Sequence, residues 1–324
     1  MLSRRNFLKL ATPALIFPQQ TMAWGHGAAC IAAPSFAAAA GYTQCKFFDD
    51  FLSAATIDLG YTRQPGFKWY LGTGAWQNSV SSWYNPGIHF DPANISVANS
   101  AVTLANGAWS NGTVWVNGIG MMSITPVNSG GYIGYTLPRT GYYWETSLKF
   151  DPTLIATGYT AWPALWSTDI KGLFIQGQTT MGVELDLMEL QGNYWSEQVI
   201  PAYHDWSYNR QLTISPNSIS FASQMSDGNY HKFGIMWTPM AAGGGTGTLA
   251  LYFDRVNYNI QRDYTNMTYS ATGGASPPAM PMNPNGDFST LDTAEMPMFF
   301  GTGNGASFPN LPMSVDYVAV WGLP

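Results

Sequence analysis

Short segments that alternate apolar and polar residues recur along the chain, and no long stretch shows the apolar spacing of an amphipathic helix. Alternation with a period of two is the pattern of half-buried strands. Gly, Pro, Asn and Asp punctuate the segments, and such a series of strands with turn-forming connections predicts a β-sandwich or a β-barrel. The candidate strands are Ser100–Ala105, Thr113–Asn117, Tyr142–Phe150, Met181–Leu190, Val199–Tyr203, Tyr230–Trp237, Leu249–Phe253 and Ser314–Trp321.

The chain has 324 residues, a length that suits one large domain or two ordinary ones. All-β sandwiches often exceed about 200 residues as a single domain. No internal repeat and no shift in composition marks a second domain. We therefore expect one domain over residues 46–324, preceded by an Ala-rich tether over residues 24–45.

Charged residues make up 10% of the chain and aromatic residues 15%, and the formal net charge is −6. Disordered chains combine high charge with few aromatics, so this composition predicts a folded protein. No run of Lys or Arg occurs in the body of the chain, and a negative protein repels a phosphate backbone, which disfavours nucleic-acid binding. A neutral, hydroxyl-rich ligand that stacks on aromatic rings fits this composition better.

The N-terminus has the layout of a removable bacterial export sequence. The pair Arg4-Arg5 resembles the twin-arginine type, an apolar run covers Leu10–Phe17, and Thr21–Ala23 is a small-x-small cleavage site. This run is far shorter than the ~20 residues that span a bilayer. We expect residues 1–23 to be removed, and the mature protein to be a soluble monomer in the periplasm or outside the cell, without stable membrane insertion. The alternative is an amphipathic first helix of the fold.

The chain has two cysteines, Cys30 and Cys45. In an oxidising compartment they are able to form a disulfide that closes a loop of about 15 residues and stabilises the fold by up to about 3 kcal/mol. Two free thiols and lipidation of Cys30 are the alternatives. No His lies at zinc-ligand spacing from them, so the pair does not predict a zinc site.

The acidic residues of one candidate strand are the most informative, because Met181–Leu190 reads Met-Gly-Val-Glu-Leu-Asp-Leu-Met-Glu-Leu. Successive strand side chains point to opposite faces, so Glu184 and Asp186 share one face. Strict alternation would place Glu189 on the other face, where burial of an unpaired carboxylate is costly. A one-residue bulge at Leu187–Met188 returns Glu189 to the face of Glu184, and bulges are common next to active sites.

With this bulge, Glu184 and Glu189 lie about four strand rises apart, roughly 13 Å between Cα atoms. Side chains that lean toward each other bring the carboxyls to about 5–6 Å, close to the ~5–5.5 Å separation of retaining glycosidases. Three carboxylates this close cannot all ionise freely, so one holds a proton at neutral pH, as a general acid must. The alternative is an acidic strand face that binds Ca²⁺ through its oxygen atoms.

The run Glu184–Glu189, Glu-Leu-Asp-Leu-Met-Glu, resembles the bulged catalytic motif of glycoside hydrolase family sixteen, the laminarinase, lichenase and agarase group. The resemblance continues in the family's order and covers residues 46–322. The other segments that carry it are Tyr142–Lys149, Ala161–Trp166, Asp227–Pro239, Leu251–Asp254 and Val315–Trp321.

The resemblance implies a jelly-roll β-sandwich of two curved antiparallel sheets, with the substrate in a concave cleft. It implies that Glu184 is the nucleophile, Glu189 the general acid and then the base, and Asp186 the residue that orients its neighbours. The implied function is a retaining endo-acting glycoside hydrolase of a β-linked polysaccharide, with β-1,3- or mixed-linkage glucan favoured, and it requires no cofactor. A transglycosylase with the same three residues and a non-catalytic carbohydrate-binding protein are the alternatives.

Further candidates for substrate binding are aromatic and histidine residues. Trp166 and Trp162 are candidates for stacking on sugar rings; one of the two belongs to the core, and Trp166 is favoured as the residue in the cleft. His204 is a candidate hydrogen-bond donor to a sugar hydroxyl or a surface-loop histidine, and Trp206 follows it closely. Asp316 resembles a structural calcium ligand of the family.

Two other positions stand out from the pattern. Arg255 stands where the family often has a glycine after Asp254. Glu145 lies within a candidate strand, where it is either buried and paired or part of the cleft. Neither position bears on the assignment of the three acidic residues.

Overall fold

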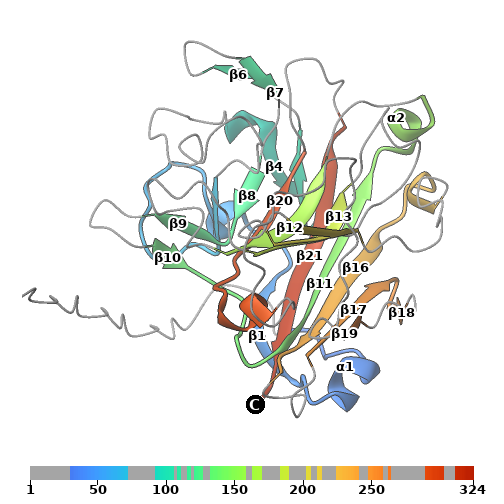
Figure 1. Ribbon diagram of the computed structural model, residues 1–324. Helices are drawn as coiled ribbons and strands as arrows, with labels where there is room; N and C mark the ends of the chain where they lie inside the picture. Colours follow the sequence, from blue (N-terminus) through green and yellow to red (C-terminus); the bar gives the residue numbers. More distant parts are fainter. Residues whose placement is uncertain are drawn as a thin grey trace, which may run out of the picture.

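The structure is a computed structural model of the chain, and it describes residues 30–71, 92–105, 108–110, 115–117, 120–126, 132–157, 163–169, 183–189, 202–205, 210–213, 224–240, 247–257, 262–263, 289–302 and 311–324. Two large sheets dominate this part of the chain (Figure 1). Its helical segments are short: α1 (Ser35–Ala39), α2 (Pro152–Thr157) and three 3₁₀ turns, Ala54–Thr56, Pro92–Asn94 and Ser289–Thr293. The prediction of an all-β fold is confirmed.

The first sheet has nine strands, all paired antiparallel, in the order β18-β17-β16-β11-β21-β5-β4, with β1 added to β21 and β19 added to β17. Its strands are β1 (Gln44–Asp49), β4 (Ile95–Ala98), β5 (Ala101–Leu104), β11 (Tyr142–Phe150), β16 (His231–Thr238), β17 (Thr248–Phe253), β18 (Val256–Asn257), β19 (Arg262–Asp263) and β21 (Met313–Gly322).

The second sheet has eight strands in the order β15-β14-β13-β12-β20-β8-β3-β2, antiparallel except for the pair β2–β3. Its strands are β2 (Ile57–Asp58), β3 (Trp69–Leu71), β8 (Gly120–Met122), β12 (Ala164–Thr168), β13 (Val183–Glu189), β14 (Ala202–Asp205), β15 (Arg210–Thr213) and β20 (Met298–Gly301). Two further pairs stand apart from both sheets: β6 (Ala108–Ser110) with β7 (Trp115–Asn117), and β9 (Ile124–Pro126) with β10 (Tyr132–Gly134).

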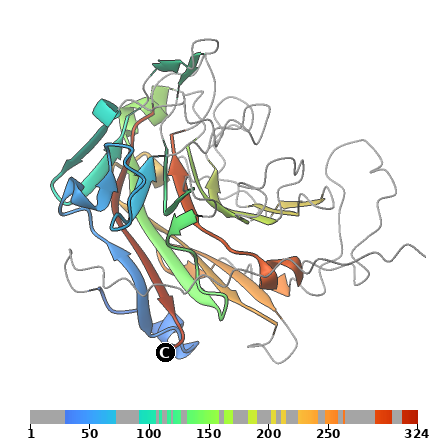
Figure 2. The same cartoon turned by 90° about the vertical axis from the view of Figure 1, so that its left-hand side faces the viewer.

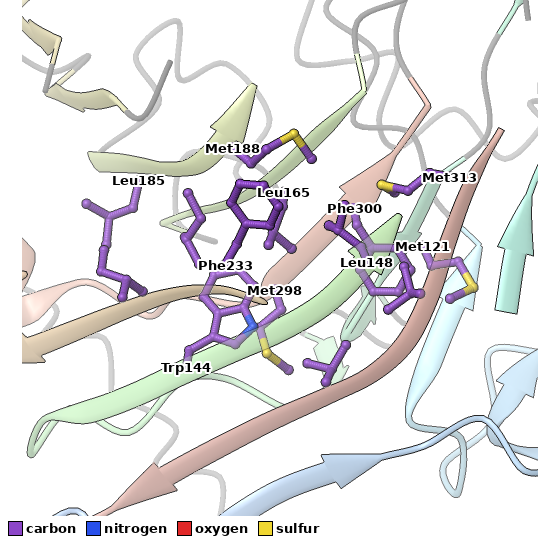
Figure 3. Packing of buried hydrophobic residues seen from close by; sticks show 14 of the residues in the cluster. Met121, Trp144, Leu148, Leu165, Leu185, Met188, Phe233, Met298, Phe300 and Met313 are labelled. Atoms are coloured by element: carbon purple, nitrogen blue, oxygen red, sulfur yellow. The ribbon is translucent and has the colours of Figure 1, made fainter. Parts of the chain in front are cut away.

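The core lies between the two large sheets, which form two layers in Figure 2. One face of each sheet contributes apolar side chains to it, as alternation along a strand requires. Figure 3 shows Leu165, Leu185 and Met188 of the eight-stranded sheet facing side chains of the other sheet. The labelled partners from β11 and β16 are Trp144, Leu148 and Phe233. Close packing of two such faces is what defines a β-sandwich.

The predicted strands are present wherever the structure describes them. Tyr142–Phe150 is β11 with the predicted bounds, and the candidates at 181–190, 230–237, 249–253 and 314–321 differ from the observed strands by two residues or fewer at each end. Many of the short strands, among them β1, β2, β3 and β8, were not predicted. They have two to six residues, which is too short for a clear period-two pattern.

Residues 30–45 are not the tether that the sequence predicted. They pack on the outer face of the nine-stranded sheet, the face turned away from the core. The Phe36 ring of α1 stacks on Tyr252 at 4.3 Å between ring centroids, and the indole Nε1 of Trp321 donates to the backbone oxygen of Ile31 at 3.1 Å. The outer face carries large aromatic side chains, and their burial under this segment is favourable.

A disulfide joins Cys30 to Cys45 at the start of β1. Of the three states that the sequence left open, the structure therefore has the disulfide. It closes a loop of 15 residues, and in the chain-entropy model such a loop stabilises a fold by about 3 kcal/mol. The covering segment is thus fixed at both ends, while residues 24–29 lie outside the described part of the chain.

Glu145 is buried and paired on the outer face, which decides between its two predicted environments. Its side chain is fully inaccessible to solvent. Arg255 holds it with two hydrogen bonds, Nη2 to Oε1 at 2.9 Å and Nε to Oε2 at 3.0 Å. The hydroxyls of Tyr143 and Tyr317 donate to the same carboxylate at 2.8 and 2.6 Å. Every lone-pair direction of this buried carboxylate thus has a donor, as burial of a charge requires.

Gly234 lies directly opposite Glu145 on β16. A Cβ at this position would come within 2.4 Å of the Tyr143 hydroxyl. The absence of a side chain lets the Tyr143 ring lie across β16 and reach Glu145.

In the described part of the chain, no helix is both long and apolar enough to cross a membrane.

Candidate active site

The bulge that the sequence predicted in the acidic strand is present in β13. This strand pairs antiparallel with β12. Met188 lies opposite Leu165, whereas Asp186 lies opposite Trp166, the next residue of β12. Leu187 is therefore an extra residue without a partner position on β12, and the alternation of side chains restarts after it.

The register places the three acidic residues on one face of the eight-stranded sheet, which we call the acid face. The paired positions are Glu184 with Thr168, Asp186 with Trp166, and Glu189 with Ala164. Directly paired residues share a face, and every second residue of a regular strand does so too. Leu185 and Met188 point the other way, into the core (Figure 3).

The acid face is nearly closed to solvent at its Glu184 end. Glu184 is 4% exposed and Asp186 3% exposed, whereas Glu189 is half-buried. Burial and, to a smaller extent, the charge of Glu189 raise the pKa of Asp186 well above its usual range, and a hydrogen bond with the Glu184 side chain opposes this shift without cancelling it. In the folded protein Asp186 therefore keeps its proton to higher pH than in the unfolded chain, the direction expected for one of three close acids.

The raised pKa of Asp186 predicts a pH-dependent stability difference for Asp186→Asn. The folded state binds the proton more tightly than the unfolded chain, whose Asp has a pKa of about 3.9. The stability of the wild-type protein therefore falls as the pH rises from the pKa of Asp186 in the unfolded chain to its higher pKa in the folded protein. An amide cannot ionise, so the melting temperature of the variant minus that of wild type should increase as pH rises from acid to neutral. A difference that stays constant or shrinks across this range would contradict the raised pKa of Asp186.

An aromatic and apolar cluster lies beside the acidic residues on the same face. Trp166 lies next to Asp186 on β12, and its ring stacks on Phe299 of β20 at 4.6 Å between centroids. Tyr70 and Met122 complete the buried cluster. Trp166 thus lies on the acid face, as its assignment to the cleft requires, but it is only 4% exposed. Its role in stacking on a sugar stays a prediction.

The other candidate substrate-binding residues are placed only in part. His204 lies in β14, where its backbone pairs with Glu184; it is thus a strand residue and not part of a surface loop. Trp162 and Trp206 lie outside the described residues. Their contact with substrate stays a prediction, as does that of His204.

Asp316 is the extra residue of a bulge in β21, because Tyr317 and Val315 pair with successive residues of β11. Its carboxylate accepts a hydrogen bond from the Ser147 hydroxyl at 3.4 Å. Burial raises its pKa, and the charges of Lys232 and Lys149 oppose the shift. Ca²⁺ takes six to eight oxygen ligands, and two nearby ammonium groups do not suit such a cage. No group of three acidic, His or Cys side chains that could hold a metal occurs among the described residues. A calcium ion at Asp316 stays a prediction.

Sequence reasoning missed Thr168, which lies opposite Glu184 on the acid face and is fully buried. It also missed Phe299 beneath Trp166. Alternation from Trp166 along β12 places Thr168 on the same face as that residue, so the sequence does contain a signal for it. No local signal identifies Phe299, because its contact joins segments far apart in the chain.

Comparison with known proteins relates this geometry to glycan-cleaving enzymes at the level of the fold. No protein-family model and no curated protein matches the sequence. A solved structure from work on endo-acting O-glycanases of the human gut microbiota that initiate mucin breakdown superposes with a TM-score of 0.54 at 17% identity, over 87% of this chain and 100% of that one. The endo-1,3-beta-glucanase from Streptomyces sioyaensis superposes with a TM-score of 0.53 at 17% identity, over 91% of this chain and 99% of that one. The chain therefore shares the β-sandwich fold of these two proteins over nearly their whole length.

Proposed function

We propose that this protein is a retaining, endo-acting glycoside hydrolase of a β-linked polysaccharide, of the type of glycoside hydrolase family sixteen. The observation that carries the proposal is the bulge at Leu187, which brings Glu184, Asp186 and Glu189 to one face of one strand. A pair of carboxyl groups that flank the glycosidic bond is the requirement for cleavage through a covalent intermediate. The fold shared with two glycan-cleaving proteins supports the same conclusion.

In the proposed reaction the Glu184 carboxylate attacks the anomeric carbon, and the bond from that carbon to the glycosidic oxygen breaks. Glu189 gives its proton to the departing oxygen. A water molecule then loses a proton to Glu189 and attacks the same carbon, which releases Glu184 from its ester bond. Two inversions restore the original configuration. These steps need no cofactor.

The difference in burial between the two glutamates supports this division of roles. Glu184 is buried beside Asp186, where a nucleophile is held in one orientation and protected from water. Glu189 is half-buried, and the residue that activates water needs access to it. Asp186 and Glu184 are joined by a hydrogen bond, so we assign Asp186 to the orientation and charge of the nucleophile.

The test of this proposal is an assay of the mature protein on a panel of polymers: β-1,3-glucan, mixed-linkage glucan and β-linked galactans. Oligosaccharides of several lengths early in the reaction indicate endo-cleavage, and the anomer that forms first, followed by proton NMR, indicates retention or inversion. We favour the two glucans as substrates. Absence of cleavage of every polymer, or release of the inverted anomer, would overturn the proposal.

Two alternatives share the same scaffold and are separated by the same assay. A transglycosylase transfers the glycosyl group to a sugar instead of water, so its products grow longer as the acceptor concentration rises. A non-catalytic carbohydrate-binding protein migrates more slowly in a gel that contains polysaccharide, but it releases no product from the polymer. The presence of both glutamates in the motif favours an enzyme.

We also infer that the protein is exported from a bacterial cytoplasm to the periplasm or the medium. The support is the sequence of residues 1–23, which lies outside the described part of the chain. Cleavage after Ala23 leaves Cys30 in the mature chain, where it is bonded to Cys45. A disulfide of this kind persists in an oxidising compartment.

A further inference from the structure

Thr168 is the buried residue that faces Glu184 across the pair β12–β13. It is fully inaccessible to solvent and lies directly opposite Glu184 on the acid face. Its hydroxyl Oγ1 donates to the backbone oxygen of Val183 at 2.9 Å. Val183 immediately precedes Glu184, so this bond is made to the peptide group that carries the proposed nucleophile.

The same backbone oxygen accepts a second hydrogen bond, from the backbone nitrogen of Asp169 at 2.9 Å. Asp169 is itself held, because its carboxylate Oδ1 accepts from the backbone nitrogen of Glu295 at 3.3 Å. One backbone hydrogen bond is sufficient to satisfy a buried carbonyl group. The Thr168 hydroxyl therefore adds a second constraint to this peptide group, beyond the one that the backbone nitrogen of Asp169 supplies.

The two ends of the acidic strand differ in whether a buried side chain on β12 holds the backbone of β13. At the Glu189 end the opposite residue is Ala164, which has no polar side-chain atom, and both residues are half-buried. At the Glu184 end the opposite residue is buried and anchors the peptide. A group that attacks carbon must be held within a fraction of an ångström of its productive position, whereas a group that exchanges protons with water has to remain accessible.

From this geometry we propose that Thr168 is a positioning residue for the proposed nucleophile Glu184. It acts through the peptide group between Val183 and Glu184 and does not touch the reacting atoms. The inference rests on the proposed function. It predicts that removal of the Thr168 hydroxyl slows the step in which Glu184 attacks and leaves substrate binding unchanged.

The experiment compares Thr168→Val with Thr168→Ser. Valine keeps the size and branching of threonine but has no hydroxyl, whereas serine keeps the hydroxyl. We expect Thr168→Val to lower kcat about ten- to a hundredfold, the scale of a small misplacement of a reacting group, with KM nearly unchanged. Thr168→Ser should recover most of this loss. The rate at which a fluorinated glycoside traps the covalent intermediate isolates the attack by Glu184, and it should fall in parallel with kcat.

Thr146→Val is the matched control. Thr146 is also fully buried, but it lies on β11 in the other sheet, and its hydroxyl accepts a hydrogen bond from the Trp144 indole at 3.0 Å. This change should lower the melting temperature and leave kcat per folded molecule unchanged. If Thr168→Val fails to fold, Thr168→Ala provides the same comparison with Thr168→Ser.

Three results would overturn the inference. The first is a Thr168→Val protein that keeps wild-type kcat and trapping rate. The second is a loss in KM alone, and the third is a Thr168→Ser protein as slow as Thr168→Val. In each of these cases the wild-type enzyme remains active, so the proposed function survives. A wild-type protein that cleaves no polymer removes the proposed function and this inference with it.

Discussion

Replacement of Glu184 by Gln is expected to reduce polysaccharide cleavage to less than about 1% of wild type, the scale seen when a nucleophile is removed. Gln has the shape of Glu but cannot form the glycosyl ester. Its amide also keeps a hydrogen bond with Asp186 within reach, so the buried end of β13 should stay folded. The measurement is kcat on the preferred polymer, with the melting temperature of the same preparation. Residual activity of several per cent in purified protein would reject Glu184 as the nucleophile.

Glu189→Gln gives the comparison that separates the two roles. A glutamine cannot donate a proton to the departing oxygen, so cleavage of the polymer should be lost here too. An aryl glycoside with an acidic phenol as leaving group needs no such proton. On that substrate Glu189→Gln should still form the intermediate quickly, whereas Glu184→Gln should not.

Asp151→Asn controls for the loss of a carboxylate as such. Asp151 is exposed and follows β11, in the other sheet. The variant should cleave the polymer at the wild-type rate. Equal losses in Glu184→Gln and Glu189→Gln on the aryl glycoside would contradict the assignment of nucleophile and general acid.

Replacement of Arg255 by Gly is expected to destabilise the protein by about 2 kcal/mol, although glycine is the residue that the backbone there favours. Arg255 has a φ of 66°, and this conformation costs a side-chain-bearing residue about 1–2 kcal/mol relative to glycine. Removal of one partner of a buried ion pair costs about 3–5 kcal/mol, because the other charge stays buried. Glu145 is that charge, and it is fully buried; Arg255 itself is 38% exposed, so the low end of this range applies. The second effect is the larger, so the net change is a loss.

The free energy of unfolding in urea measures this change, and two variants test its cause. Arg255→Gly combined with Glu145→Gln should recover part of the loss, because no unpaired carboxylate remains in the outer face. Val256→Gly, at the adjacent exposed position that begins β18, should change stability far less. An Arg255→Gly protein more stable than wild type would mean that backbone strain outweighs the ion pair.

Arg255 illustrates why a departure from a family pattern is hard to interpret from sequence. The pattern has glycine after Asp254, so arginine there looks like a tolerated change in a hairpin. In the fold its side chain reaches Glu145, 110 residues earlier in the chain. No local spacing predicts that contact. The same holds for the contact between Phe299 and Trp166, because it joins two strands that are far apart in the sequence.

The N-terminal segment shows a second limit of the sequence. Ala-rich composition over residues 24–45 indicated a tether, since alanine has little apolar surface to bury. Residues 30–45, the part of this segment that the structure describes, cover the outer face of the nine-stranded sheet. They do so because Tyr143, Tyr252 and Trp321 form an apolar surface there. That surface is assembled from three separate strands, and only the folded sheet brings it together.

The sequence by itself determined the longer strands, their alternation and the bulge in the acidic strand, because these depend on residues within a few positions of one another. A buried unpaired carboxylate is too costly to tolerate, and this required one extra residue at Leu187–Met188; the pairing with β12 shows that it is Leu187. The tertiary structure decided what depends on distant pairs: the disulfide from Cys30, the ion pair of Glu145, and Thr168 opposite Glu184. Such pairs arise from the order of strands in a sheet, which period and composition do not specify.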